Sequence, residues 1–246
     1  MPSLRTRLCP IRRGSHIVHG SCSGFKAHVA QRTVKTLLPD FTHKRVLDLG
    51  CGYGWHCKYA SASGASYVLG TDISHKMLER AEKINAGSGI EYRCIAMEDL
   101  RFPDETFDVV LSSLAFHYVR DFVPLVHNIS RWIKHGGEFV FSVEHPVFTS
   151  YGTQDWYYDE DGEILHFPVD HYYDEGKREA VFLGETVVKY HRTLTTYLNT
   201  VLQNEFEIRH IVEPQPPDSM LGLPGMQDEM RRPMMLLVSA IKSITP

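Results

Sequence analysis

The sequence predicts an α/β protein in which a mostly parallel sheet of seven strands carries helices on both faces. From residue 44 onward, short β-branched and apolar runs alternate with amphipathic segments, which is the pattern of successive βαβ units. The chain has 246 residues, of which 43% are hydrophobic and 23% charged. It is therefore long enough for one large domain with a substantial core.

Each strand is expected where a short apolar run ends at a turn signal. The seven expected strands are Arg45–Leu49, Ser66–Thr71, Ile90–Ile95, Phe107–Ser112, Glu138–Val143, Phe206–Val212 and Met234–Ile241. Apolar residues recur at helical spacing from Phe122 to Ile133 and from Leu194 to Leu202, which predicts two helices with one buried face each. Ser74 is expected to cap the helix that follows the second strand.

Residues 1–24 are expected to form a basic N-terminal arm, and residues 25–246 a single domain that opens with a helix over Phe25–Leu38. Seven basic side chains and no acidic one precede Asp40. Such a start also resembles an organellar transit peptide, but Pro2, Pro10 and Gly14 interrupt any long amphipathic helix there. We therefore favour the arm.

The composition excludes two classes of protein. No apolar stretch approaches the roughly 20 residues of a membrane-spanning helix. The net charge of −4 does not fit a basic nucleic-acid binder, so a nucleic-acid partner is not expected. The five cysteines are odd in number and have no zinc-site spacing, which indicates reduced thiols and a cytoplasmic protein. They are Cys9, Cys22, Cys51, Cys57 and Cys94.

Residues 146–191 interrupt the alternation and are expected to form an insertion after the fifth strand. This segment is rich in aromatic and acidic residues, such as those between Tyr151 and Asp161. We expect the insertion to be a lid whose aromatic side chains line the site of a bound molecule. An oligomer surface, for example that of a homodimer, is the alternative.

A glycine-rich turn provides the strongest local evidence for function. The run Val46–Gly54 reads as a buried strand that leads into this turn, and Asp72 follows 22 residues after Gly50, where a ribose would offer two hydroxyls. Asp48 would repel a pyrophosphate but could help to hold an ammonium group. Trp55 replaces the third spaced glycine of the dinucleotide pattern. These features favour a nucleoside cofactor with an ammonium group.

Five segments, in order and spacing, resemble those of class I S-adenosylmethionine (SAM)-dependent methyltransferases, in particular the type 11 and ubiquinone/menaquinone-biosynthesis group. They are VLDLGCGYG, VLGTDIS, AMEDL, FDVVLSSLAFHYV and HGGEFVFSVEHPVF. The resemblance covers residues 25–241 and implies a Rossmann-like sheet whose last strand runs antiparallel beside the fifth. It also implies that a methyl group moves from SAM to an O, N or C atom of a small-molecule acceptor by SN2 displacement, leaving S-adenosylhomocysteine (SAH).

The resemblance also assigns residues to the cofactor. Asp48 and Gly50, Cys51 and Gly52 would line its methionine end, Asp72 its ribose, and Met97, Glu98 and Asp99 its adenine. Ser113 and Leu114 would close the site near the methyl group. Ile73 and Met77, which follow Asp72, complete the expected cofactor contacts.

Polar residues on the acceptor side are the remaining candidates. His117 is the candidate general base or acceptor-positioning residue, because imidazole titrates near neutrality, and Tyr118 is its neighbour. His117 could instead be a hydrogen-bonded wall residue. His145, His191 and Arg192 are expected to contact the acceptor, with backbone-carbonyl binding as the alternative. Their spacing matches no histidine metal motif, so no metal is expected.

Two further functions stay open on the sequence alone. A nicotinamide (NAD(P))-dependent oxidoreductase could use a related sheet, although Asp48 and Trp55 disfavour it. A non-catalytic protein could keep the SAM pocket as a sensor or scaffold, because fold does not fix function.

Overall fold

The computed structural model describes residues 37–182 and 185–244 of the chain. The expected arm (1–24), Cys9, Cys22 and nearly all of the helix expected over Phe25–Leu38 lie outside the described residues.

The core is a seven-stranded sheet with the order β10-β11-β5-β4-β1-β2-β3. The strands are β1 (Arg45–Leu49), β2 (Tyr67–Asp72), β3 (Ile90–Cys94), β4 (Phe107–Ser113), β5 (Ile133–Glu144), β10 (Phe206–Val212) and β11 (Met235–Lys242). Strands β1 to β5 pair in parallel, whereas β11 runs antiparallel between β5 and β10. The expected seven strands and the antiparallel last strand are confirmed.

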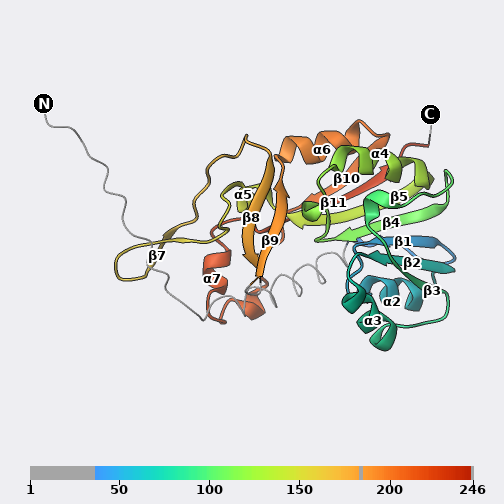
Figure 1. Ribbon diagram of the computed structural model, residues 1–246, viewed down its shortest axis with the longest axis horizontal. Helices are drawn as coiled ribbons and strands as arrows, with labels where there is room; N and C mark the ends of the chain where they lie inside the picture. Colours follow the sequence, from blue (N-terminus) through green and yellow to red (C-terminus); the bar gives the residue numbers. More distant parts are fainter. Residues whose placement is uncertain (1–36, 183–184, 245–246) are drawn as a thin grey trace, which may run out of the picture.

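Helices cover both faces of this sheet (Figure 1). They are α2 (Trp55–Ala62) and α3 (His75–Ile84) on one face, and α4 (Phe122–Trp132) and α6 (Leu194–Leu202) on the other. The side chain of Ser74 accepts a hydrogen bond from Met77 N–H, as a helix N-cap does. The apolar stripe of α4, which includes Leu125 and Ile129, is buried in the larger hydrophobic core. The helices predicted after Ser74, over Phe122–Ile133 and over Leu194–Leu202 are therefore confirmed.

Strand β5 begins earlier than the sequence predicts. The prediction placed its start at Glu138, but the strand begins at Ile133, directly after α4. Ile133 pairs with Phe107, and the regular register resumes where Glu138 pairs with Val109. Gly136, which lies between the two pairs, has a φ of 73°. This glycine allows the irregular backbone that joins the helix to the strand without a loop.

The insertion consists of one short helix and two β-hairpins at one end of the main sheet (Figure 1). Its elements are α5 (Pro146–Ser150), β6 (Tyr157–Tyr158), β7 (Ile164–His166), β8 (Gly176–Phe182) and β9 (Glu185–His191). The sequence predicts none of these short strands. The connection from β10 to β11 also holds a 3₁₀ turn, η3 (Asp218–Met220), and a helix, α7 (Met226–Glu229), that the sequence does not predict. No helix within residues 37–182 and 185–244 has the length and apolar character needed to cross a membrane.

Candidate cofactor and acceptor site

The glycine turn after β1 has the backbone geometry that glycine permits. Gly50, Gly52 and Gly54 have φ angles of 73°, 54° and 73°, in the region that other residues avoid. A Cβ atom on Gly50 would lie 2.4 Å from Cβ of Ala115 and 3.4 Å from Cε of Met97. A Cβ atom on Gly52 would meet no atom within 4 Å. The turn is thus packed against the protein at Gly50 and open at Gly52.

Asp72, the last residue of β2, is bonded directly to this turn. One carboxylate oxygen accepts the N–H of Gly52 at 2.9 Å, and the other accepts the N–H of Ser74 at 2.8 Å. The next residue, Ile73, is 74% exposed. Met77 lies in the first turn of α3 and is half-buried. Because each carboxylate oxygen has a second lone pair, Asp72 can still accept hydrogen bonds from two hydroxyls.

Asp48 is buried in β1 just before the turn. Its side chain is 1% exposed, and one oxygen accepts a hydrogen bond from Cys57 Sγ at 3.3 Å. The other oxygen, Oδ1, has no hydrogen-bond partner among the described residues. Burial raises the pKa of Asp48 to about 7, and the charge of Asp72 adds to this effect. A cationic group near Oδ1 would favour the ionised carboxylate.

The third expected station, Met97–Asp99, forms a 3₁₀ turn (η1) between β3 and β4. Met97 is half-buried and packs against the larger core. Glu98 and Asp99 are exposed, so their carboxylates can reach a ligand. Met97 lies close to Gly50, which brings this station next to the glycine turn.

The segment after β4 passes beside the turn. Leu114 has a φ of 52°, unusual for a residue other than glycine. Its N–H donates to the carbonyl of Ser142 at 2.9 Å and to the Ser142 hydroxyl at 3.1 Å. The hydroxyl of Ser113 lies 3.3 Å from that of Ser142. These bonds to β5 fix the strained backbone at the end of β4, where local strain often accompanies function.

His117 lies in a 3₁₀ turn (η2, Phe116–Tyr118) that follows this segment. Its ring is 2% exposed, and its Nδ1 accepts the N–H of Glu144 at 3.3 Å. The neutral ring therefore carries its proton on Nε2. Nδ1 is occupied and Nε2 is already protonated, so this geometry favours a positioning role over that of a general base. Tyr118 is 41% exposed, and burial of its hydroxyl end raises its pKa.

The other expected acceptor residues are engaged within the protein. His145 caps α5 by accepting Val147 N–H at 3.1 Å, and its Nε2 lies 2.8 Å from Glu213 Oε1, without hydrogen-bond alignment. His191 is fully buried between the Thr149 hydroxyl (2.7 Å) and the Tyr172 carbonyl (2.9 Å).

Arg192 is also used internally. It donates to the carbonyls of Phe116, Val119, Arg120 and Tyr190. This is the backbone-binding alternative, and it ties the end of the insertion to the segment after β4. For both His191 and Arg192 the geometry favours a structural role over direct acceptor contact.

Sequence reasoning missed a buried charged network at the end of β5. Lys189 Nζ donates to both carboxylate oxygens of Glu144 and to Gln154 Oε1, each at 2.8 Å. Gln154 in turn donates to Glu144 Oε2 at 2.8 Å. Lys189 and Glu144 are 1% and 3% exposed. The signal was weak: Lys189 occupies an inward position of a strand whose neighbouring inward residues are Val187 and His191.

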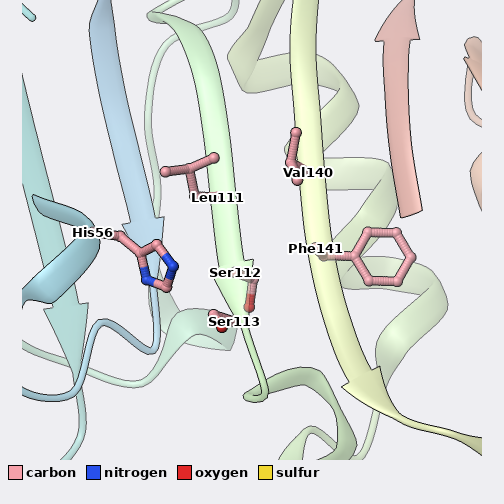
Figure 2. Close-up of a pocket in the computed structure, with 6 residues that line it drawn as sticks. All are labelled: His56, Leu111, Ser112, Ser113, Val140 and Phe141. Atoms are coloured by element: carbon pink, nitrogen blue, oxygen red, sulfur yellow. The ribbon is translucent and has the colours of Figure 1, made fainter. Parts of the chain in front are cut away.

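The second missed residue is His56, in the first turn of α2. It is 8% exposed, and burial lowers its pKa to about 4. Nε2 of its ring has no hydrogen-bond partner among the described residues. Its ring lines a small cavity with Ser112 and Ser113 (Figure 2). The sequence did hold a signal for this residue: His56 is a histidine on an otherwise apolar helix face, directly after the glycine turn.

Comparison with known proteins identifies the family. The methyltransferase domain family matches residues 47–141, which include the glycine turn, Asp72 and the segment after β4. A solved structure from Listeria monocytogenes, assigned as an S-adenosylmethionine-dependent methyltransferase, is 50% identical. It covers 89% of this chain and 99% of its own, with a TM-score of 0.86. The chain belongs to the class I SAM-dependent methyltransferases.

Two further relatives of this methyltransferase agree. A SAM-dependent methyltransferase from Mesorhizobium loti is 40% identical, covering 87% of this chain and 97% of its own, with a TM-score of 0.79. A ubiquinone biosynthesis O-methyltransferase from Neisseria meningitidis is 32% identical over 137 residues, which are 48% of this chain and 58% of that protein.

SAM is therefore the cofactor, with SAH as its product, which removes the nicotinamide-dependent alternative. The residues present fit this cofactor: Asp48 has an unpartnered buried oxygen, Gly52 leaves open space, and Asp72 has free lone pairs. Across the described ranges, no group of three or more His, Cys, Asp and Glu side chains is arranged to hold a metal ion.

Proposed function

We propose that this methyltransferase transfers the methyl group of SAM to an O, N or C atom of a small-molecule acceptor. The acceptor would bind between the C-terminal ends of β4 and β5 and the insertion at residues 146–191, which acts as a lid. Nucleic acid is not part of this proposal.

The observation that carries the proposal is the attachment of the insertion to the segment after β4. Arg192, at its end, bonds to carbonyls at Phe116, Val119 and Arg120. Lys189, in β9, pairs with Glu144 at the end of β5. These bonds hold the aromatic insertion over the edge of the sheet where the glycine turn and Ser113 lie. In open α/β sheets, ligands bind at this edge.

The residues of the site would mainly bind and orient. Asp48 would face the ammonium group of the cofactor, the open backbone at Gly52 its methionine end, and Asp72 its ribose. When bound, SAM supplies a methyl group activated by the positive sulfonium. The protein then has to align the acceptor at near-attack distance and exclude water. The segment from Ser113 to His117, half-buried at its start and buried from Ala115 onward, would supply that wall.

His117 would act in this scheme as a positioning residue. Its Nδ1 accepts Glu144 N–H, which orients the ring and places the proton of the neutral ring on Nε2. A donor can orient the acceptor but cannot remove its proton. Carboxylic acids are already ionised at neutral pH and need no protein base, whereas a phenol needs none only in its ionised form.

The test has two stages. Calorimetry with SAH, and with NAD as the control titrant, measures cofactor binding; SAH binding alone is expected. SAH formation from SAM is then followed by mass spectrometry with panels of phenols, amines and carboxylates. Phenols come first, because the Neisseria meningitidis relative is an O-methyltransferase of ubiquinone biosynthesis. Bulk tRNA serves as the macromolecular control, and turnover with tRNA but no small molecule would contradict the proposal.

The scaffold alternative gives a different pattern in the same experiments. A sensor or scaffold would bind SAH but would form none from SAM with any panel. A cytoplasmic location is also part of the proposal, supported by the described cysteines Cys51, Cys57 and Cys94, which are free thiols. Light scattering of the purified protein decides whether the lid surface also forms a homodimer.

A further inference from the structure

Two buried polar atoms without hydrogen-bond partners flank the glycine turn. Within the described residues, four buried side-chain atoms lack such a partner. Two of them, in His145 and Arg232, lie in or next to the insertion. The other two are Asp48 Oδ1, two residues before Gly50, and His56 Nε2, two residues after Gly54. An unsatisfied buried polar group is costly, so a pair of them at a ligand site requires an explanation.

His56 is held in place by its surroundings. It lies in the first turn of α2, where its ring meets the ring of Trp55 edge to face at a centroid distance of 4.8 Å. The imidazole lies beside the end of β1 and is directed toward Ser112 and Ser113 of β4 (Figure 2). Between them is a cavity of about 10 Å³, which has room for roughly one water molecule. The ring thus borders both the glycine turn after β1 and the end of β4.

The two atoms have complementary chemistry. Asp48 Oδ1 can only accept a hydrogen bond when the carboxylate is ionised, whereas a neutral imidazole can donate one from Nε2. The methionine end of SAM carries an ammonium group, which donates, and a carboxylate, which accepts. One unsatisfied acceptor that precedes the turn in the chain and one available donor that follows it match this zwitterionic group.

We propose that His56 binds the carboxylate of the methionine end of SAM through Nε2–H, directly or through one water molecule in the cavity beside Ser113. Asp48 would face the ammonium group on the other side of the turn. The proposal rests on the placement of the methionine end at this turn in the proposed function. His56 is thereby a cofactor-binding residue in addition to those expected from the sequence.

The charge state of His56 suits this role. Burial lowers its pKa to about 4, so the ring is uncharged near neutral pH. An uncharged donor can bind a carboxylate without repelling the nearby sulfonium. In the part of the chain that the structure describes, no acidic side chain forms a hydrogen bond with Nε2 that would hold the ring protonated.

The test compares ligands with and without the amino-acid group. Calorimetry measures the dissociation constants of SAH, of its decarboxylated analogue, and of 5′-methylthioadenosine, which lacks both charged groups. In His56→Leu the SAH constant is expected to rise about 10- to 100-fold, the range for a hydrogen bond to a charged group. The constants of the other two ligands are expected to stay within about 2-fold of the wild-type values. In His56→Gln, whose amide N–H can replace Nε2–H, most SAH affinity should return.

Controls separate this proposal from a structural role. His127→Leu, at an exposed histidine of α4, should change no dissociation constant. Asp48→Asn should weaken SAH and its decarboxylated analogue, which keep the ammonium group, and leave 5′-methylthioadenosine unchanged. Equal weakening of all three ligands in His56→Leu and His56→Gln would overturn the proposal, as would no weakening of SAH. Failure of wild-type protein to bind SAH would instead contradict the proposed function.

A second measurement determines the tautomer of His56 in the wild-type protein. Long-range ¹H–¹⁵N spectra of the labelled wild-type protein report which ring nitrogen carries the proton, and His56→Gln identifies the signal. With SAH bound, Nε2 is expected to be protonated and its chemical shift to move. An unprotonated Nε2 in the complex would overturn the proposal.

Discussion

Asp72 and Gly52 are joined by a hydrogen bond of 2.9 Å from the glycine N–H to the carboxylate. The bond connects the turn after β1 with the end of β2. The same carboxylate also accepts Ser74 N–H at the start of α3. One carboxylate therefore joins two parts of the cofactor site that the sequence separates by 20 residues.

Replacement of Asp72 should affect both binding and stability. In Asp72→Ala, the N–H groups of Gly52 and Ser74 lose their hydrogen-bond acceptor. The ribose hydroxyls of the cofactor would lose the same acceptor. We expect SAH affinity to fall about 10- to 100-fold and the melting temperature to fall by several degrees. Calorimetry and thermal unfolding measure the two effects. Asp104→Ala, which removes an exposed partner of Arg131, is the matched control. Unchanged SAH affinity in folded Asp72→Ala would contradict the role of this residue.

Gly52→Ala should separate ligand approach from backbone strain. Gly52 and Gly162 both have positive φ, and a Cβ atom on either would meet nothing within 4 Å. Each alanine should therefore cost about 1 to 2 kcal/mol of stability. Only Gly52→Ala should also weaken SAH binding, by about 10-fold or more, because a methyl group would stand where the cofactor approaches the backbone. Equal SAH affinity in the two variants would show that the turn does not touch the cofactor.

The buried groups Asp48 and His56 should affect the free energy of unfolding in opposite directions as the pH changes. Asp48 has a pKa raised to about 7, so the stability linked to its protonated form is present at low pH and is lost as pH rises through 7. His56 has a pKa lowered to about 4, so the stability linked to its neutral form is present above about pH 6.5 and is lost as pH falls through 4. Between pH 4 and 6.5 the two effects oppose each other.

Denaturant titrations at several pH values test this opposition. In Asp48→Asn only the effect of His56 remains, so the free energy of unfolding should rise from pH 4 to 6.5. In His56→Gln only the effect of Asp48 remains, so the free energy of unfolding should fall as the pH rises to 7. Each change is on the order of 3 to 4 kcal/mol. Parallel curves for the two variants would contradict the assignments. SAH should also bind wild-type protein more tightly at pH 8 than at pH 6, because the ammonium group favours ionised Asp48.

The buried pair of Lys189 and Glu144 can be tested by comparing a single with a double substitution. The single substitution should lower the free energy of unfolding far more than the double one. Lys189→Met leaves a buried carboxylate without its cation, and we expect a loss of about 3 to 5 kcal/mol. Lys189→Met combined with Glu144→Gln should recover much of it. Lys177→Met removes the exposed partner of Glu179 and should cost less than about 1 kcal/mol. Equal losses in the single and double variants, measured by denaturant unfolding, would contradict the importance of this pair.

Local patterns were sufficient to predict the sheet, the glycine turn and the position of Asp72. Each depends on residues that are neighbours in the chain: an apolar run, a glycine-rich turn, an acid at a strand end. The cap at Ser74 was predictable for the same reason. The start of β5 was not, because Gly136 permits a backbone irregularity that the apolar pattern does not reveal.

The polar groups of the interior depend on long-range pairing and could not be predicted. Glu144 and Lys189 are 45 residues apart, and one of them lies in the insertion. His191 and Arg192 were expected near the acceptor, yet their donors and acceptors are used by distant carbonyls and a hydroxyl. His117 was expected to be a general base, an acceptor-positioning residue or a hydrogen-bonded wall residue; its ring is buried, and its tautomer depends on the distant Glu144 N–H.

The insertion is attached at α5 after β5, at Lys189 and Arg192 before α6, and through Arg231, which donates to the carbonyls of Ile164 and Leu165 in β7. The hairpin β6–β7 between these anchors makes no strand pairing with the main sheet. Because Arg231 binds main-chain carbonyls of the hairpin, the side chains there can change without disturbing the strands that carry the cofactor residues. If the insertion is the lid proposed above, exchange of residues 157–166 between relatives should change the preferred acceptor and leave SAM binding unchanged.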